Sequence, residues 1–189
     1  MGPNWAESEY GQDRRSALRF LYKESVAMSA SQIVLIEDNP ADVLLVEMAL
    51  KENNVSCELT TFSSGREALR ILCPPAGTET SAFVPDAILL DLNMPKSDGF
   101  EVLDKLKHTP HLAHVPVAII TSSRAAKDKA RTYRLGAIRY VQKPSQLEEF
   151  LAKVGQAVKE LLAVKEMPEA KRASSALSAA DRQRRRRSL

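Results

Sequence analysis

From about residue 31 onward, the sequence alternates between short apolar runs and longer segments whose apolar residues recur at helical spacing. Several of the short runs are rich in β-branched residues, which favour buried strands. Strict alternation of strands and helices predicts a parallel sheet that carries helices on both faces. We therefore expect a doubly wound, five-stranded α/β fold whose strands are residues 33–36, 57–62, 87–90, 115–121 and 138–142.

Local signals mark the ends of the expected helices. Asn39 and Pro40 are typical of a helix start, and Gly136 is typical of a helix end. Ser145, with Glu148 three residues later, matches a capping box at the start of the last helix. The expected helices are residues 40–53, 65–72, 99–106, 125–135 and 145–162.

Polar residues stand at the carboxyl ends of the expected strands, the edge where open parallel sheets bind ligands. They are Glu37, Asp38, Asp91, Thr121, Ser122 and Lys143. Three carboxylates at one edge repel each other, and a Mg²⁺ ion, which takes oxygen ligands, relieves that repulsion. Lys143 and Thr121 supply the positive charge and the hydroxyl that a phosphoryl group requires. Asp91 can act as a carboxylate nucleophile toward phosphorus.

Four segments in this order carry a resemblance to a known family: "VLIEDNPAD", "ILLDLNMPKSDGFEVL", "VAIITSS" and "YVQKP". Together they resemble the receiver domains of two-component response regulators, over about residues 30–164. Each fragment alone is weak, but four fragments at successive strand ends are specific. The resemblance implies a flavodoxin-like (βα)5 receiver fold.

The resemblance also implies a role for each motif residue. Asp91 is the expected phosphoacceptor, and Glu37 and Asp38 are the acidic pair that holds Mg²⁺ with it, Asp38 directly and Glu37 through water. The peptide bond between Lys143 and Pro144 is expected to be cis, as is usual in that family. The other expected site residues are Asn93 (backbone carbonyl to the metal), Thr121 (switch hydroxyl), Tyr140 (switch aromatic) and Lys143 (charged partner of the phosphoryl group).

The function implied by the resemblance is that of a stand-alone response regulator. A sensor histidine kinase donates a phosphoryl group to Asp91, and the protein is a signalling protein that can catalyse its own phosphorylation and dephosphorylation. A finer likeness of "IEDNPADVLLVEMAL" and of the long loop before "PDAILLDL" points to regulators of phytochrome-type kinases. The expected output surface, where a homodimer could also form, combines the fourth helix, the fifth strand and the fifth helix.

Two other functions stay open. A phosphatase of the haloacid dehalogenase type also uses an aspartyl nucleophile, but it needs a second aspartate two residues later, where this chain has Asn93. A nucleic-acid-binding regulator would use the arginine run at residues 184–187, although no aromatic residue accompanies that run.

Simpler structural interpretations apply to single residues. Glu37 and Asp38 could merely cap a helix, an interpretation that their coincidence with Asp91 and Lys143 disfavours. A metal site built from three histidines is disfavoured because they lie in a loop that contains a proline; these are His108, His111 and His114.

The charge is distributed unevenly along the chain. Residues 30–164 hold 15 Lys and Arg against 17 Asp and Glu, whereas residues 165–189 hold 8 against 3, so the body carries −2 and the tail +5. We expect residues 165–189 to form a disordered basic tail. Residues 1–29 form an expected N-terminal extension in which residues 18–22 can be helical, and Met28 is a candidate native start.

The expected location of the protein is the cytoplasm. No apolar run is long enough to span a bilayer, and the amino end lacks the pattern of a secretory signal. Cys57 and Cys73 are expected to be reduced thiols.

Overall fold

A computed structural model of the chain describes residues 30–74, 83–95 and 97–165. The expected N-terminal helix, the candidate start at Met28 and residues 166–189 of the expected tail lie outside the described residues. The elements are β1 (Ser31–Ile36), α2 (Pro40–Glu52), β2 (Cys57–Phe62), α3 (Gly65–Leu72), β3 (Ala87–Leu90), β4 (Asn93–Met94), β5 (Ser97–Asp98), α4 (Gly99–His108), β6 (Val117–Thr121), α5 (Ala126–Arg134), β7 (Arg139–Gln142) and α6 (Leu147–Lys165).

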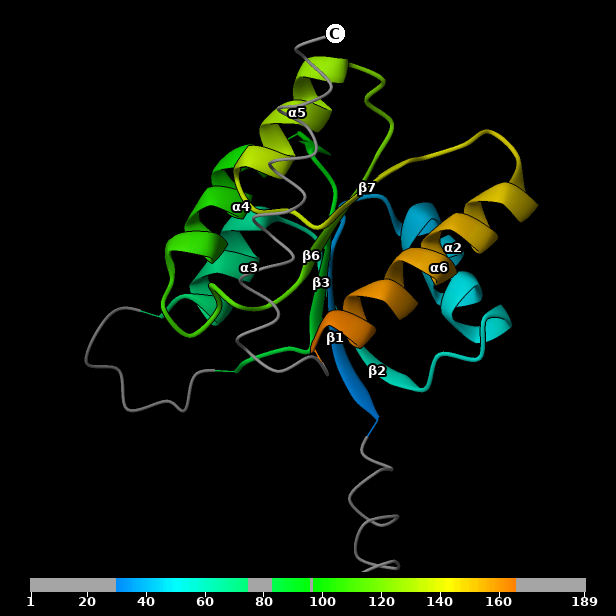
Figure 1. The fold of residues 1–189 in the computed structure, drawn as a ribbon, viewed down its shortest axis with the longest axis horizontal. Helices are drawn as coiled ribbons and strands as arrows, with labels where there is room; N and C mark the ends of the chain where they lie inside the picture. Colours follow the sequence, from blue (N-terminus) through cyan, green and yellow to red (C-terminus); the bar gives the residue numbers. More distant parts are fainter. Residues whose placement is uncertain (1–29, 75–82, 96, 166–189) are drawn as a thin grey trace, which may run out of the picture. The chain divides into compact units, whose positions relative to one another are not determined.

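The main sheet has five strands in the order β2-β1-β3-β6-β7, and every neighbouring pair is parallel. Helices α2 and α6 cover one face of this sheet, and α3, α4 and α5 cover the other (Figure 1). The doubly wound five-stranded fold predicted from the alternating pattern is therefore confirmed.

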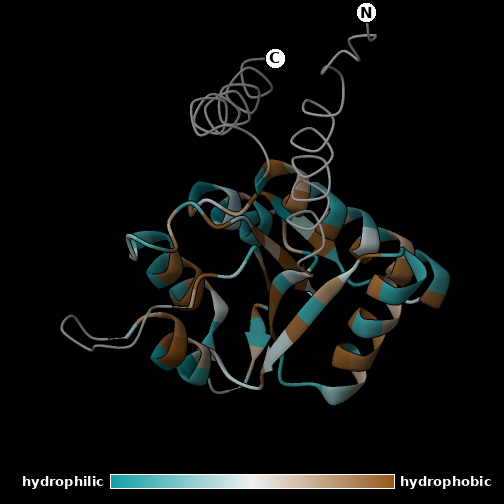
Figure 2. Ribbon diagram, turned by 90° about the horizontal axis from the view of Figure 1, so that it is seen from below, coloured by the Kyte–Doolittle hydropathy of each residue, from teal (hydrophilic) through white to brown (hydrophobic). Residues whose placement is uncertain are grey.

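The core consists of two hydrophobic clusters, one on each face of the sheet. Along β1, Val34 and Ile36 belong to the cluster under α3 and α4, while Ile33 and Leu35 belong to the cluster under α2 and α6. All four residues of β3 are buried. A parallel strand that is covered on both faces is apolar along its whole length. The helices are covered on one side only, and they carry both hydrophobic (brown) and hydrophilic (teal) residues (Figure 2).

Several element boundaries differ from the expected ones. Strand β6 begins at Val117 instead of Val115, because Pro116 has no N–H for the ladder. The two-residue strands β4 and β5 form an antiparallel pair that was not predicted. Gly136 has the positive φ of 93° expected after a helix.

The predicted capping box at Ser145 is wrong. Helix α6 begins at Leu147, and the amide of Phe150 donates to the carbonyl of Gln146. Gln146 therefore precedes the helix directly, and Ser145 lies one residue too early to cap it. Over the described ranges, no helix has the length and apolar character needed to cross a membrane.

Candidate functional site

The carboxyl edge of the sheet brings residues from four strands together. Backbone hydrogen bonds continue the ladder one residue past the strand ends: Asp91 N donates to Ile36 O (3.0 Å) and Lys143 N donates to Thr121 O (2.8 Å). Glu37 N likewise donates to the carbonyl of the last residue of β2 (3.0 Å). The ladder thus fixes the backbone of Glu37, Asp91 and Lys143, so their side chains start from rigid positions.

Three carboxylates meet at this edge. Glu37, Asp38 and Asp91 each offer an oxygen, and these oxygens lie within 4.8 Å of one another. Glu37 and Asp91 are buried, with 4% and 5% of their surface exposed. A group of three hard oxygen donors, two of them buried, fits a divalent cation of the Mg²⁺ or Mn²⁺ type, which agrees with the predicted kind of metal site.

Asp38 differs from the other two carboxylates. Its side chain makes no hydrogen bond or ion pair with any residue in the described part of the chain. Both oxygens of Glu37 are engaged, since Oε1 accepts from Asn39 N (3.1 Å) and Oε2 accepts from Lys143 Nζ (2.7 Å). This contrast leaves Asp38 the freer oxygen donor, and its role as a direct metal ligand stays a prediction.

The ammonium of Lys143 lies among carboxylates. Its Nζ is 2.7 Å from Glu37 Oε2, 2.8 Å from Asp42 Oδ2 and 3.0 Å from Asp91 Oδ2. Burial disfavours the charged lysine, but the hydrogen bonds to Asp42 and Glu37 and the charge of Asp91 outweigh it, so the pKa of Lys143 lies above its ordinary value. For Glu37, burial is the largest influence and raises the pKa of the carboxyl despite the lysine.

The peptide bond between Lys143 and Pro144 is trans, so the prediction of a cis bond is wrong. The trans form is the preferred one for most X–Pro bonds. The long side chain of Lys143 reaches the carboxylates from this trans backbone, so a cis bond is not needed to aim the ammonium into the site.

Thr121 and Tyr140 meet at Ser123, just after β6. Thr121 is fully buried, and its Oγ1 accepts a hydrogen bond from Ser123 N (3.3 Å). The Tyr140 hydroxyl donates to Ser123 O (2.9 Å). Burial raises the pKa of this phenol. Thr121 and Tyr140, the two predicted switch residues, are thus linked through the backbone of Ser123.

Asn93 bridges two loops at the mouth of the site. Its backbone N–H donates to Asp91 Oδ1 (3.0 Å), and its Nδ2 donates to Ser122 Oγ (2.8 Å). The role of its carbonyl as a metal ligand stays a prediction. Its contacts orient the Asp91 carboxylate and tie the loop after β3 to the loop after β6.

Two residues of this site, Asp42 and Ser123, were not identified from the sequence. The only signal for Asp42 is an additional carboxylate in the first turn of the helix that follows the acidic pair. Ser123 acts mainly through its backbone and carries no side-chain signal for that role.

Within the described residues, His108, His111 and His114 do not form a group that could hold a metal ion. His108 is the last residue of α4, so the expectation that it lies in a loop is wrong. His108 Nδ1 lies 2.8 Å from Asp104 O, and His111 Nε2 lies 2.9 Å from Leu72 O. Across the described ranges, the grouping with metal-binding geometry is the acidic one.

The comparisons with known proteins agree on one family. A family model described as the response regulator receiver domain matches residues 33–155. The chain is similar to the response regulator Rcp1 of Synechocystis sp., with 37% identity over 122 residues, which cover 65% of this chain and 82% of that protein.

Solved structures of phytochrome response regulators have the same fold. The phosphorylated cyanobacterial phytochrome response regulator RcpA matches with a TM-score of 0.63 and 34% identity, over 74% of this chain and 98% of that one. The Mn²⁺-bound form of Rcp1 matches with a TM-score of 0.64 and 34% identity, over 73% and 99%. The bacteriophytochrome response regulator AtBRR matches with a TM-score of 0.54 and 36% identity, over 70% and 93%.

Proposed function

This chain belongs to the family of response regulator receiver domains, and on that premise we propose that it accepts a phosphoryl group on Asp91 from a sensor histidine kinase. The observation that carries the proposal is the buried Asp91 carboxylate, which lies beside two other carboxylates and 3.0 Å from the ammonium of Lys143. The similarity to phytochrome response regulators supports a kinase of the phytochrome type.

In the proposed reaction, an oxygen of Asp91 attacks the phosphorus of a phosphohistidine. The new P–O bond forms as the P–N bond breaks, and the electron pair of that bond stays on the imidazole nitrogen. Glu37, Asp38 and Asp91 would hold Mg²⁺, which neutralises charge on the phosphoryl oxygens when it is bound. Lys143 donates to a phosphoryl oxygen, and the hydroxyl of Thr121 turns to another.

The change at Asp91 would reach the surface through Thr121 and Tyr140. Both side chains are hydrogen-bonded to the backbone of Ser123. A rotation of Thr121 toward the phosphoryl group therefore changes the segment that accepts the hydrogen bond of Tyr140 on β7. We propose that output, including homodimer formation, uses the surface made by α5, β7 and α6, and that the protein works in the cytoplasm.

The other two functions have less support. A dehalogenase-type phosphatase would need an aspartate where the chain has Asn93, and the family match is to receivers. Nucleic-acid binding through residues 184–187 concerns a segment outside the described residues. A steep salt dependence of binding that disappears on deletion of residues 181–189 would favour it.

The test of the proposed function is phosphorylation by a small acyl-phosphate donor, read by intact mass. We expect one phosphoryl adduct in the wild type that requires Mg²⁺ and is absent in Asp91→Asn. Asp104→Asn, which changes an aspartate on α4 outside the site, is the matched control and should retain the adduct. Mg²⁺-dependent labelling that persists in Asp91→Asn would contradict the assignment of the phosphoacceptor.

A further inference from the structure

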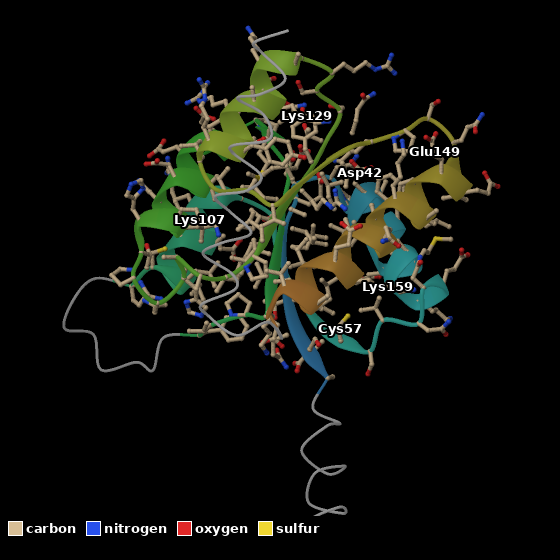
Figure 3. The ribbon with its side chains drawn as sticks, viewed as in Figure 1. Asp42, Cys57, Lys107, Lys129, Glu149 and Lys159 are labelled. Atoms are coloured by element: carbon tan, nitrogen blue, oxygen red, sulfur yellow. The ribbon has the colours of Figure 1, made fainter. Side chains whose placement is uncertain are left out.

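Asp42 is a fourth carboxylate at the site, outside the group of three that fits a metal ion. It lies in the first turn of α2, at the amino-terminal end of that helix (Figure 3). Its Oδ2 accepts from Lys143 Nζ (2.8 Å) and from Asn39 Nδ2 (3.2 Å). An acidic residue at this position stabilises a helix even when it faces solvent, yet the side chain of Asp42 is only 23% exposed.

The Lys143 ammonium has three protons, and the three carboxylates of Glu37, Asp42 and Asp91 use all of them. Two of these three, Glu37 and Asp91, are also in the group suited to a metal ion. Their other oxygens accept from the backbone amides of Asn39 and Asn93. All four oxygens of Glu37 and Asp91 thus already accept a hydrogen bond, so a divalent cation on these carboxylates has to use a second lone pair close to the Lys143 ammonium.

Two cations on the same pair of carboxylates repel each other strongly, most of all where water is excluded. When Glu37 and Asp91 turn to a metal, two of the three contacts of Lys143 weaken. Asp42 is the remaining contact, and the hydrogen bond from Asn39 holds its carboxylate in place. Asp42 can therefore balance the ammonium charge without taking part in metal binding.

We propose that Asp42 is a positioning residue that receives the Lys143 ammonium when Glu37 and Asp91 bind a divalent cation. Held by Asp42, the ammonium stays in the site without competing for the metal-binding oxygens, and it remains available for a phosphoryl oxygen. This inference rests on the proposed function in one respect, namely that Glu37, Asp38 and Asp91 bind Mg²⁺.

The first test is calorimetric titration of the full chain with Mg²⁺. We expect Asp42→Asn to weaken Mg²⁺ binding by roughly five- to tenfold, a change that lies within the coupling energies of residues in contact. The matched control is Glu47→Gln, which removes the same charge from an exposed position on the same helix. It should leave the affinity within about twofold. Wild-type affinity in Asp42→Asn would overturn the inference.

A double-mutant cycle separates positioning from a general electrostatic effect. If Asp42 acts through Lys143, then Asp42→Asn in a Lys143→Gln background should change the Mg²⁺ affinity by less than about twofold. If the full loss persists in that background, Asp42 acts as a ligand or through its field, and the inference is overturned. A wild-type protein that binds no Mg²⁺ would contradict the proposed function itself, which is a distinguishable result.

A second readout does not depend on how the Lys143 variant folds. The ¹⁵Nζ resonance of Lys143 can be followed by NMR as Mg²⁺ is added to the wild type and to Asp42→Asn. We expect the ammonium signal to persist in the wild type and to be lost through exchange with water in Asp42→Asn. Loss or retention of the signal in both proteins alike would contradict the proposal.

Discussion

Among the lysines that the structure describes, Lys143 and Lys107 are the two that are only partly exposed, and their surroundings differ. Lys143, at the carboxyl edge of the sheet, contacts three carboxylates. Lys107, on α4 and labelled in Figure 3, donates to two backbone carbonyls, Val115 O at 2.6 Å and Ala113 O at 3.3 Å. Burial lowers the pKa of Lys107 to about 8, whereas the carboxylates hold the pKa of Lys143 above its ordinary value against the effect of burial.

The difference shows what each lysine is suited to do. The two carbonyls accept hydrogen bonds from Lys107 but do not neutralise its charge. These hydrogen bonds join α4 to the loop before β6, so we interpret Lys107 as a structural contact. Full negative charges around Lys143 keep it an ammonium at any physiological pH. That is the form a phosphoryl acceptor site requires.

The largest expected effect comes from removing the ammonium of the site. Lys143→Met leaves buried carboxylates without their counter-charge, and we expect the free energy of unfolding at pH 7 to fall by about 3 kcal/mol without metal. Mg²⁺ should restore part of this loss, because it neutralises the same oxygens. Urea denaturation with and without Mg²⁺ measures both effects. Unchanged stability would mean that the carboxylates do not depend on Lys143 for their counter-charge.

The next effect concerns the glycine beside Asp91. A Cβ on Gly99 would lie 2.6 Å from Leu92 Cα and 2.7 Å from Asp91 O, and both atoms are backbone, so the backbone at the site has to shift. We expect Gly99→Ala to cost about 2 kcal/mol and to lower phosphoryl uptake. Urea denaturation and the mass assay report these two effects. Unchanged uptake would mean that the position of Asp91 tolerates the shift.

The low pKa of Lys107 predicts that the free energy of unfolding depends on pH. The folded pKa of Lys107, about 8, lies below the usual lysine value of 10.5, so the unfolded chain binds more protons between these two values. Stability from this group is therefore fully present above pH 10.5 and is lost as the pH falls through 8. Between pH 7 and 10 it should rise by about 2 kcal/mol.

The measurement compares urea denaturation of the wild type and Lys107→Met at pH 7, 8.5 and 10. Other lysines and tyrosines titrate in the same range, so the difference between the two proteins is the relevant quantity. If that difference does not change with pH, the ammonium of Lys107 is not destabilised by its burial.

The smallest expected effect lies at Gly136, which packs against the stem of Lys107. Its φ is +93°, and an added Cβ would meet Lys107 Cγ and Cδ at 3.5 Å, an ordinary contact. The cost of Gly136→Ala is therefore backbone strain of about 1 kcal/mol. Thermal unfolding should show this loss, while Mg²⁺ binding stays unchanged; altered Mg²⁺ binding would mean that the two regions are coupled.

Much of the fold was predictable because hydrophobic periodicity and helix-end residues are local signals. The five parallel strands, the five helices and the left-handed conformation of Gly136 follow from such signals. The β4–β5 pair was missed because two-residue strands have no period to detect. The predicted cap at Ser145 failed because a short polar side chain near a helix fits more than one position.

In the candidate site, too, some contacts could be predicted from the sequence and others could not. The carboxyl ends of parallel strands lie at one edge of the sheet, so the proximity of Glu37, Asp38 and Asp91 could be predicted from the sequence. The contact between Asp42 and Lys143 joins residues 101 positions apart. This contact could not be predicted, because it depends on how α2 is placed against the end of β7. No local pattern distinguishes a carboxylate that stabilises a helix end from one that also contacts a buried ammonium.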